Sequence, residues 1–119
     1  MAEHDLAAQL VEWIVALLSP ESEPSPTRDY YFILLRQGRS VPEAVGLAVD
    51  DLLEEVRSAV SREESYNPRA HRARLSLPSN VPFSAHRLPR PALVRRIAQE
   101  RLGDNRAHAG RHGTRKGSR

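Results

Sequence analysis

Residues 40–64, SVPEAVGLAVDDLLEEVRSAVSREE, carry the strongest helical signal of the chain and decide its fold. Ser40 and Glu43 form a capping-box pattern, in which each side chain bonds the backbone N–H of the other residue. The pattern predicts a long helix that begins after Ser40 and fades near Glu64, because Asn67-Pro68 does not let a helix continue. One face of this helix is apolar and comprises Val45, Ala48, Val49, Leu52, Leu53, Val56 and Val60.

Two further helices are predicted before this one, which makes an all-α fold the expectation. The first spans about residues 5–18, where apolar residues follow helical spacing up to Ser19-Pro20. The second starts near Ser25 or Thr27 with a proline in its first turn, and it ends at Gly38. A strand is the alternative for its run of six apolar residues, but the proline start and the glycine stop favour a helix. We therefore expect a small three-helix N-terminal bundle, or a helical hairpin with one helix added.

The composition changes after Asn67, where five prolines fall within 24 residues. This stretch is expected to be extended, with one short strand around Arg74–Leu77. A short helix should follow from Pro91 and stop at Gly103, and the residues beyond it are too polar to order themselves. These expectations divide the chain into an acidic helical domain at 1–65, a Pro-rich extended arm at 66–90, a short basic helix at 91–103 and a flexible Arg-rich tail at 104–119.

The net charge of +3 hides a strong asymmetry between the two halves of the chain. Residues 1–65 contain five arginines and thirteen acidic residues, a net charge of −8. Residues 66–119 contain thirteen basic and two acidic residues, a net charge of +11. Such an asymmetry is typical of an acidic folded part that carries a basic arm. The chain has no cysteine, which excludes disulfides, thiolate metal sites and cysteine nucleophiles.

No targeting or membrane segment is predicted, so we expect a soluble, cytoplasmic protein. The first residues include Glu3 and Asp5, whereas a signal peptide begins with positive charge. The longest apolar runs have six residues, and a transmembrane helix needs roughly 20.

The helix–glycine–helix segment at residues 31–56 allows two interpretations. A turn of this length and composition occurs in DNA-binding helix pairs. The second helix would then face phosphates, yet it carries acidic residues in its middle, which phosphates repel. We favour a packed helical hairpin over a helix that reads a DNA groove.

No constellation in the sequence supports catalysis, and we expect no enzyme, metal or other cofactor. Three acidic pairs occur, and a solvated acidic face is the favoured interpretation of them: Asp50/Asp51, Glu54/Glu55 and Glu63/Glu64. Asp50 and Glu54 share a helix face, but no histidine lies within helical reach of them. Four histidines lie in the basic half: His71, His86, His108 and His112. Those of the tail, His108 and His112, have the spacing of metal ligands on a helix, but we expect them to assist a basic patch rather than bind metal.

The arginine-rich C-terminal arm is the strongest functional signal. Phosphate contact is favoured over base stacking, because only one aromatic residue, Phe83, lies near these charges. The alternatives are a tail that only keeps the protein soluble, or an arm that binds an acidic protein surface, such as the protein's own helical half or that of a second copy. The predicted phosphate-binding residues are Arg87, Arg90, Arg95, Arg96, Arg101, Arg106, Arg111, Arg115, Lys116 and Arg119.

Two functions follow from these patterns. The first is a non-enzymatic accessory protein that binds DNA or RNA through its C-terminal arm, while its acidic helical half docks to itself or to a protein. The second is an assembly adaptor in a larger complex or viral particle, in which the Pro-rich arm packs along neighbouring subunits. The residues predicted to lie in protein interfaces are Trp13, Leu17, Leu75, Leu77 and Phe83.

Overall fold

The structure, a computed structural model, describes residues 2–78, 81–82 and 84–110, with side chains for 6–78, 81–82 and 84–103. Its elements are α1 (Ala2–Leu17), α2 (Pro26–Arg36), α3 (Val41–Ser61), α4 (Pro68–Leu75), the 3₁₀ turn η1 (Ala85–Arg87) and α5 (Pro91–Gly110). The all-α prediction is confirmed, and no strand occurs in the part of the chain that the structure describes. None of the described helices combines the length and the apolar character that a membrane span needs.

The predicted starts of α2 and α3 are confirmed by their caps. The hydroxyl of Ser25 accepts a hydrogen bond from the backbone N–H of Arg28 at 3.1 Å. The hydroxyl of Ser40 accepts one from the backbone N–H of Glu43 at 3.3 Å. The carboxylate of Glu43 accepts a hydrogen bond from the guanidinium of Arg39 at 2.8 Å. Ser40 and Glu43 therefore form only the half of the capping box in which the serine hydroxyl accepts from the Glu43 N–H.

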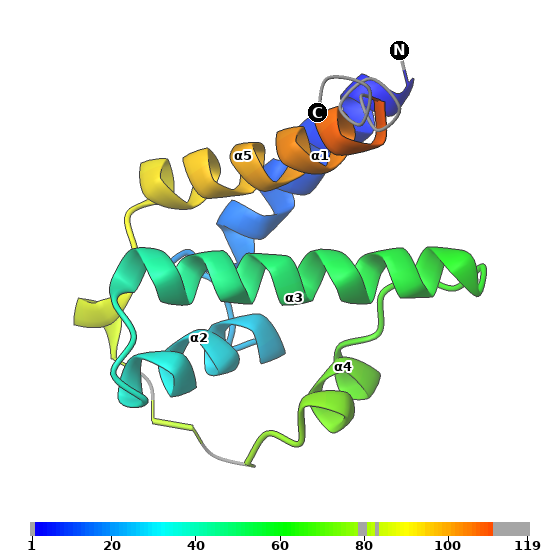
Figure 1. The fold of residues 1–119 in the computed structure, drawn as a ribbon. Helices are drawn as coiled ribbons and strands as arrows, with labels where there is room; N and C mark the ends of the chain where they lie inside the picture. Colours follow the sequence, from blue (N-terminus) through cyan, green and yellow to red (C-terminus); the bar gives the residue numbers. More distant parts are fainter. Residues whose placement is uncertain (1, 79–80, 83, 111–119) are drawn as a thin grey trace, which may run out of the picture.

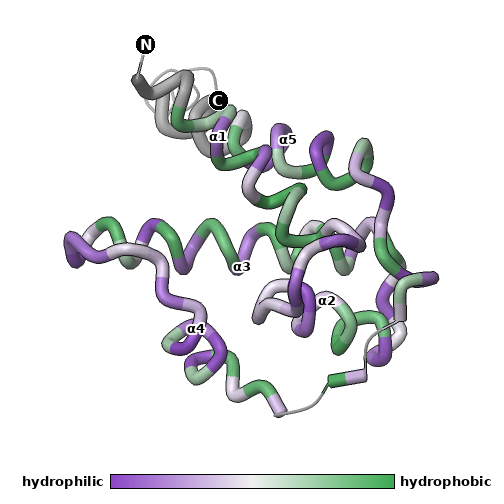
Figure 2. Tube along the Cα trace, turned by 180° about the vertical axis from the view of Figure 1, so that it is seen from behind, coloured by the Kyte–Doolittle hydropathy of each residue, from purple (hydrophilic) through white to green (hydrophobic). Residues whose placement is uncertain are grey.

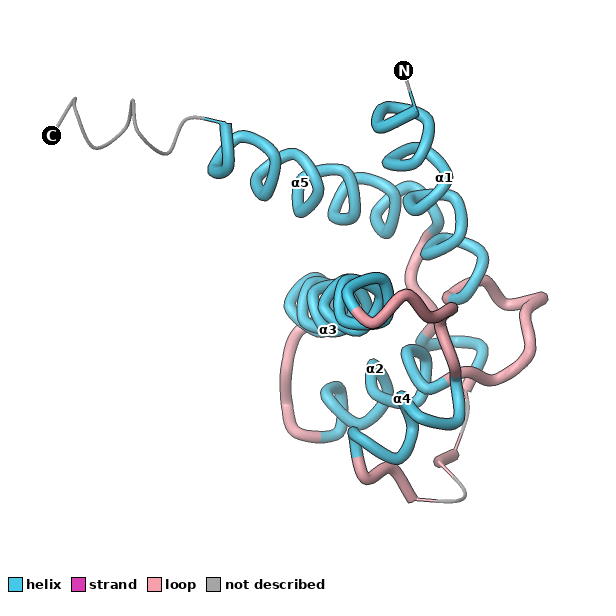
Figure 3. The backbone as a smooth tube through the Cα atoms, turned by 90° about the vertical axis from the view of Figure 1, so that its right-hand side faces the viewer, coloured by secondary structure: helices cyan, strands magenta, loops and turns pink. Residues whose placement is uncertain are grey.

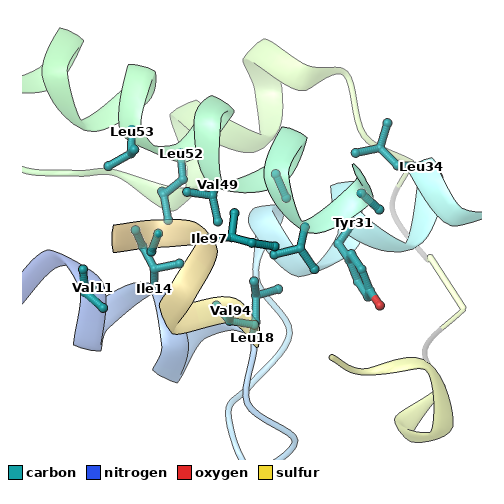
Figure 4. Close-up of a cluster of buried hydrophobic side chains, with 14 of the residues drawn as sticks. Val11, Ile14, Leu18, Tyr31, Leu34, Val49, Leu52, Leu53, Val94 and Ile97 are labelled. Atoms are coloured by element: carbon teal, nitrogen blue, oxygen red, sulfur yellow. The ribbon is translucent and has the colours of Figure 1, made fainter. Parts of the chain in front are cut away.

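Helix α3 lies between two layers of helices. In Figures 1 and 3, α1 and α5 lie on one side of α3, and α2 and α4 lie on the other. Leu52 and Val49 of α3 meet Ile14 of α1 and Ile97 of α5 in the main core (Figure 4). Helix α5 therefore completes a core that the sequence assigned to the three N-terminal helices alone.

A buried arginine joins the end of α1 to the start of α2. The guanidinium of Arg28, which is fully buried, donates to the carbonyl of Ser19 and to the hydroxyl of Ser22. Burial lowers the pKa of Arg28 from its usual value, and the neighbouring Asp29 counteracts this effect. The contact fixes the loop between the two helices.

Residues 68–75 form a helix, so the predicted extended arm with a strand around Arg74–Leu77 is wrong here. Proline suits the first helical position, where its missing N–H is not needed. Asn67 caps α4, because its side-chain oxygen accepts hydrogen bonds from the N–H groups of Arg69 and Ala70 at 3.0 and 3.4 Å. Helix α4 buries only His71 and is dominated by hydrophilic residues (Figure 2), so it has no apolar stripe for a sequence pattern to detect.

The predicted stop at Gly103 is also wrong. Helix α5 extends past Gly103 and ends at Gly110. Glycine costs about 1 kcal/mol in a helix interior relative to alanine, which weakens a helix without ending it. Residues 111–119 lie outside the described residues.

Candidate functional site

Arginines of the basic half form ion pairs with carboxylates of the acidic half at the surface of the molecule. Arg95 of α5 places two guanidinium nitrogens 3.0 and 3.2 Å from the carboxylate of Glu12 in α1. Arg101 of α5 lies 2.8 Å from the carboxylate of Asp50 in α3. Both residues were predicted to bind phosphate, and the structure gives each a carboxylate partner from the acidic half. This arrangement matches the predicted alternative in which the basic arm contacts the protein's own helices.

Pairs of an arginine with a carboxylate also hold α4 against α2 and α3. Arg74 donates to Asp51 and to Glu55 in α3, each at 2.6 Å, and these hydrogen bonds raise the pKa of Arg74. Arg72 donates to Asp29 in α2 at 2.7 Å. Charge-assisted hydrogen bonds of this length are roughly twice as strong as neutral ones. Polar contacts, rather than an apolar face, therefore position α4.

His71 lies at the centre of this polar contact. It is fully buried, with Nε2 2.7 Å from Asp51 and Nδ1 2.7 Å from the hydroxyl of Tyr66. Burial first, then the charges of Glu55 and Asp51, raise the pKa of Tyr66 to about 12, so its phenol keeps its proton. In a neutral His71 ring, the Tyr66 hydroxyl donates to Nδ1 and the Nε2–H donates to the Asp51 carboxylate.

The pKa of Asp51 reflects two opposing effects. Burial raises it, but hydrogen bonds from His71 and Arg74 and the charge of the Arg74 guanidinium lower it by more, so the pKa of Asp51 lies below its ordinary value of 3.8. One prediction is corrected here. Asp51 and Glu55 belong to a largely buried polar cluster rather than to a solvated acidic face, and the buried His71 is a partner of Asp51.

Three predicted phosphate-binding residues, Arg87, Arg90 and Arg96, are exposed, and we call them the basic end. Among the residues that the structure describes, none of the three has a carboxylate within ion-pair distance. The hydroxyl of Tyr31 in α2 donates to the carbonyl of Arg87, which ties η1 to α2. In Figures 1 and 2, η1 and the start of α5 lie at the same end of the molecule as the end of α2, whose last turn carries the exposed Arg36.

A cleft of about 540 Å³ lies beside the basic end, between the starts of α3 and α5. Leu93 and Ile97 supply apolar surface, and Arg96 adds a positive charge at its border. The carboxylates of Glu43 and Glu100 also line the cleft, so its lining carries charges of both signs. This mixed character does not favour a dedicated anion pocket, and phosphate contact is better served by the exposed basic end.

The remaining predicted residues are distributed as follows. Trp13 and Leu17 of α1 are half-buried, and the Trp13 ring meets Tyr66 edge-on with a centroid distance of 5.1 Å. Leu75 and Leu77 are also half-buried. The side chain of Arg106 and residues Phe83, Arg111, Arg115, Lys116 and Arg119 lie outside the described residues and side chains.

Sequence reasoning missed the polar cluster made by Asp29, Asp51, Glu55, Tyr66, His71, Arg72 and Arg74. One signal was present, because Asp51 and Glu55 are four residues apart and share a helix face. The short segment NPRAHRARL supplies matching arginines only once it is recognised as a capped helix. Among the described side chains, no three histidines or carboxylates come together in a group that could hold a metal ion.

Comparison of the chain with protein-family models, with curated proteins and with solved structures gives no match.

Proposed function

We propose that this chain is a non-enzymatic accessory protein that binds nucleic acid through phosphate contacts. The observation that carries the proposal is the basic end, where Arg87, Arg90 and Arg96 are exposed while other arginines of the C-terminal half hold carboxylates. An exposed guanidinium retains its donors for a phosphate, whereas one that is paired must first give up its carboxylate.

Binding through this surface is electrostatic and carries little base specificity. Arginine contacts with phosphates fix position on a nucleic acid but do not read its sequence. The C-terminal residues Arg111, Arg115, Lys116 and Arg119 add four positive charges that follow α5 along the chain. The acidic helices oppose non-specific binding and keep the affinity moderate. DNA and RNA are both ligands under this proposal.

One observation favours this function over the assembly adaptor. The adaptor interpretation needs the apolar residues of the Pro-rich segment for contacts with neighbouring subunits. In the structure, Val81 and Leu88 of that segment pack against the protein's own core, and Pro89 is buried. Contact with a partner or a second copy through Trp13 and Leu17 of α1 remains a prediction.

A salt titration tests the proposal. Binding to a fluorescent duplex and to a single-stranded RNA is measured by anisotropy between low and moderate salt. For a duplex, log K falls against log salt with a slope of about −0.9 per phosphate contact, so Arg90→Gln/Arg96→Gln should flatten the slope by about 1.8.

The matched control is Arg57→Gln/Arg62→Gln, which removes the same charge from two exposed arginines near the end of α3. This control should leave the slope within about 0.5 of the parent, because neither arginine makes a phosphate contact in the proposal. Equal effects of the two double variants, or no binding by the parent at low salt, would reject the basic end as the binding surface.

A further inference from the structure

Helix α4 carries three arginines, and two of them cover buried carboxylates. The side chains of Asp29 and Glu55 are each 9% exposed, while Arg72 and Arg74, which bond them, are 34% and 47% exposed. The acidic groups therefore lie underneath and the guanidinium groups lie on the outside. The third arginine, Arg69, is exposed in the first turn of the same helix.

The attachment of α4 differs from that of the other helices. It buries one side chain, His71, and its remaining contacts with α2 and α3 include three hydrogen bonds from arginines to carboxylates. Residues 61–65, which lead into it, are exposed. Segments with few buried apolar contacts open at a lower free-energy cost than the core of a protein.

We propose that α4 is a second phosphate-binding segment, which Asp29, Asp51 and Glu55 mask by holding its arginines. Phosphate and carboxylate each offer two acceptor oxygens to the planar guanidinium fork, so a nucleic-acid backbone competes for the same arginine side chains. The inference rests on the proposed function, because the basic end brings the polyanion to the protein. Binding then shifts α4 from its carboxylates to phosphates.

His71 sets the cost of this exchange. Its hydrogen bonds to Asp51 and Tyr66 hold α4 in place, so the masked state dominates in the absence of a polyanion. A carboxylate that contacts an arginine but not His71 is therefore the best place to weaken the mask. Glu55 meets this condition, since it bonds Arg74 and makes no contact with the histidine ring among the hydrogen bonds of the described residues.

The test compares two neighbouring carboxylates of α3. Glu55→Gln releases Arg74 from one partner, whereas the control Glu54→Gln removes the same charge from a side chain that is 69% exposed. Duplex binding is measured by anisotropy against salt for both variants. Glu55→Gln should bind about threefold or more tightly than the control with the same salt slope, because the phosphate contact of Arg74 forms in both variants and only the cost of releasing Arg74 falls. Adding Arg74→Gln to Glu55→Gln should return the affinity to that of the control.

Hydrogen exchange provides a second readout on the full parent chain. Adding duplex should speed amide exchange at residues 68–75 and leave α3 unchanged. If Glu55→Gln unfolds, as judged by circular dichroism, Asp29→Asn tests the same mask through Arg72. Equal binding by Glu55→Gln and Glu54→Gln, or unchanged exchange in α4, would overturn the inference. The proposed function fails separately, if the parent itself does not bind nucleic acid.

Discussion

Replacing Leu52 with alanine should lower the free energy of unfolding by about 3 kcal/mol. Leu52 has no exposed surface and lies on the face of α3 that points toward α1 and α5 (Figure 4). The substitution removes three buried carbons, each worth about 0.8 kcal/mol of transfer free energy, and the cavity that remains adds to this cost. In a domain of this size the melting temperature should fall by roughly 10 °C or more.

Val60→Ala is the matched control on the same helix. The sequence pattern places Val60 on the same apolar face as Leu52, but in the structure Val60 is 66% exposed. Its truncation should change the free energy of unfolding by less than about 0.5 kcal/mol. Urea denaturation followed by circular dichroism measures both variants. If Val60→Ala costs as much as Leu52→Ala, the assignment of the buried face of α3 is wrong.

Three further predictions concern single contacts. Because the pKa of Asp51 lies below its ordinary value of 3.8, its ionised carboxylate stabilises the fold at a pH above 3.8. This stabilisation is lost as the pH falls through the lowered pKa. The stability of Asp51→Asn between about pH 5 and pH 2 should therefore depend less on pH than the stability of the parent. Tyr66→Phe should lower the free energy of unfolding, measured by urea denaturation, by about 1–3 kcal/mol, because it removes the hydrogen-bond partner of Nδ1 in the buried His71. An unchanged free energy of unfolding would contradict that hydrogen bond. Gly46→Ala would place a Cβ 2.6 Å from a guanidinium nitrogen of Arg101, which lies at the end of a flexible side chain and can move. Alanine has a higher helix propensity than glycine by about 1 kcal/mol, so the melting temperature should stay equal or rise. A clear drop would show that Arg101 cannot move aside.

The local signals in the sequence were sufficient for the main helices. Ser25 and Ser40 cap α2 and α3 as predicted, because an N-cap depends on residues within one turn. The apolar face of α3 was predicted well around Val49 and Leu52, which are fully buried. The prediction failed at Val60, because burial at this position depends on whether another helix covers that turn of α3. The residue pattern of one helix does not contain this information.

The sequence by itself determined that the chain is all-α, that its second half is basic, and where most of its helices begin. Only the tertiary structure decided which charges remain exposed. The pairs Arg95–Glu12 and Arg74–Asp51 join residues far apart in the chain, and no local periodicity encodes such a pairing. The fold therefore divides the candidate phosphate-binding arginines into exposed ones and ones held by carboxylates, because a paired arginine must give up its carboxylate before it can bind a phosphate.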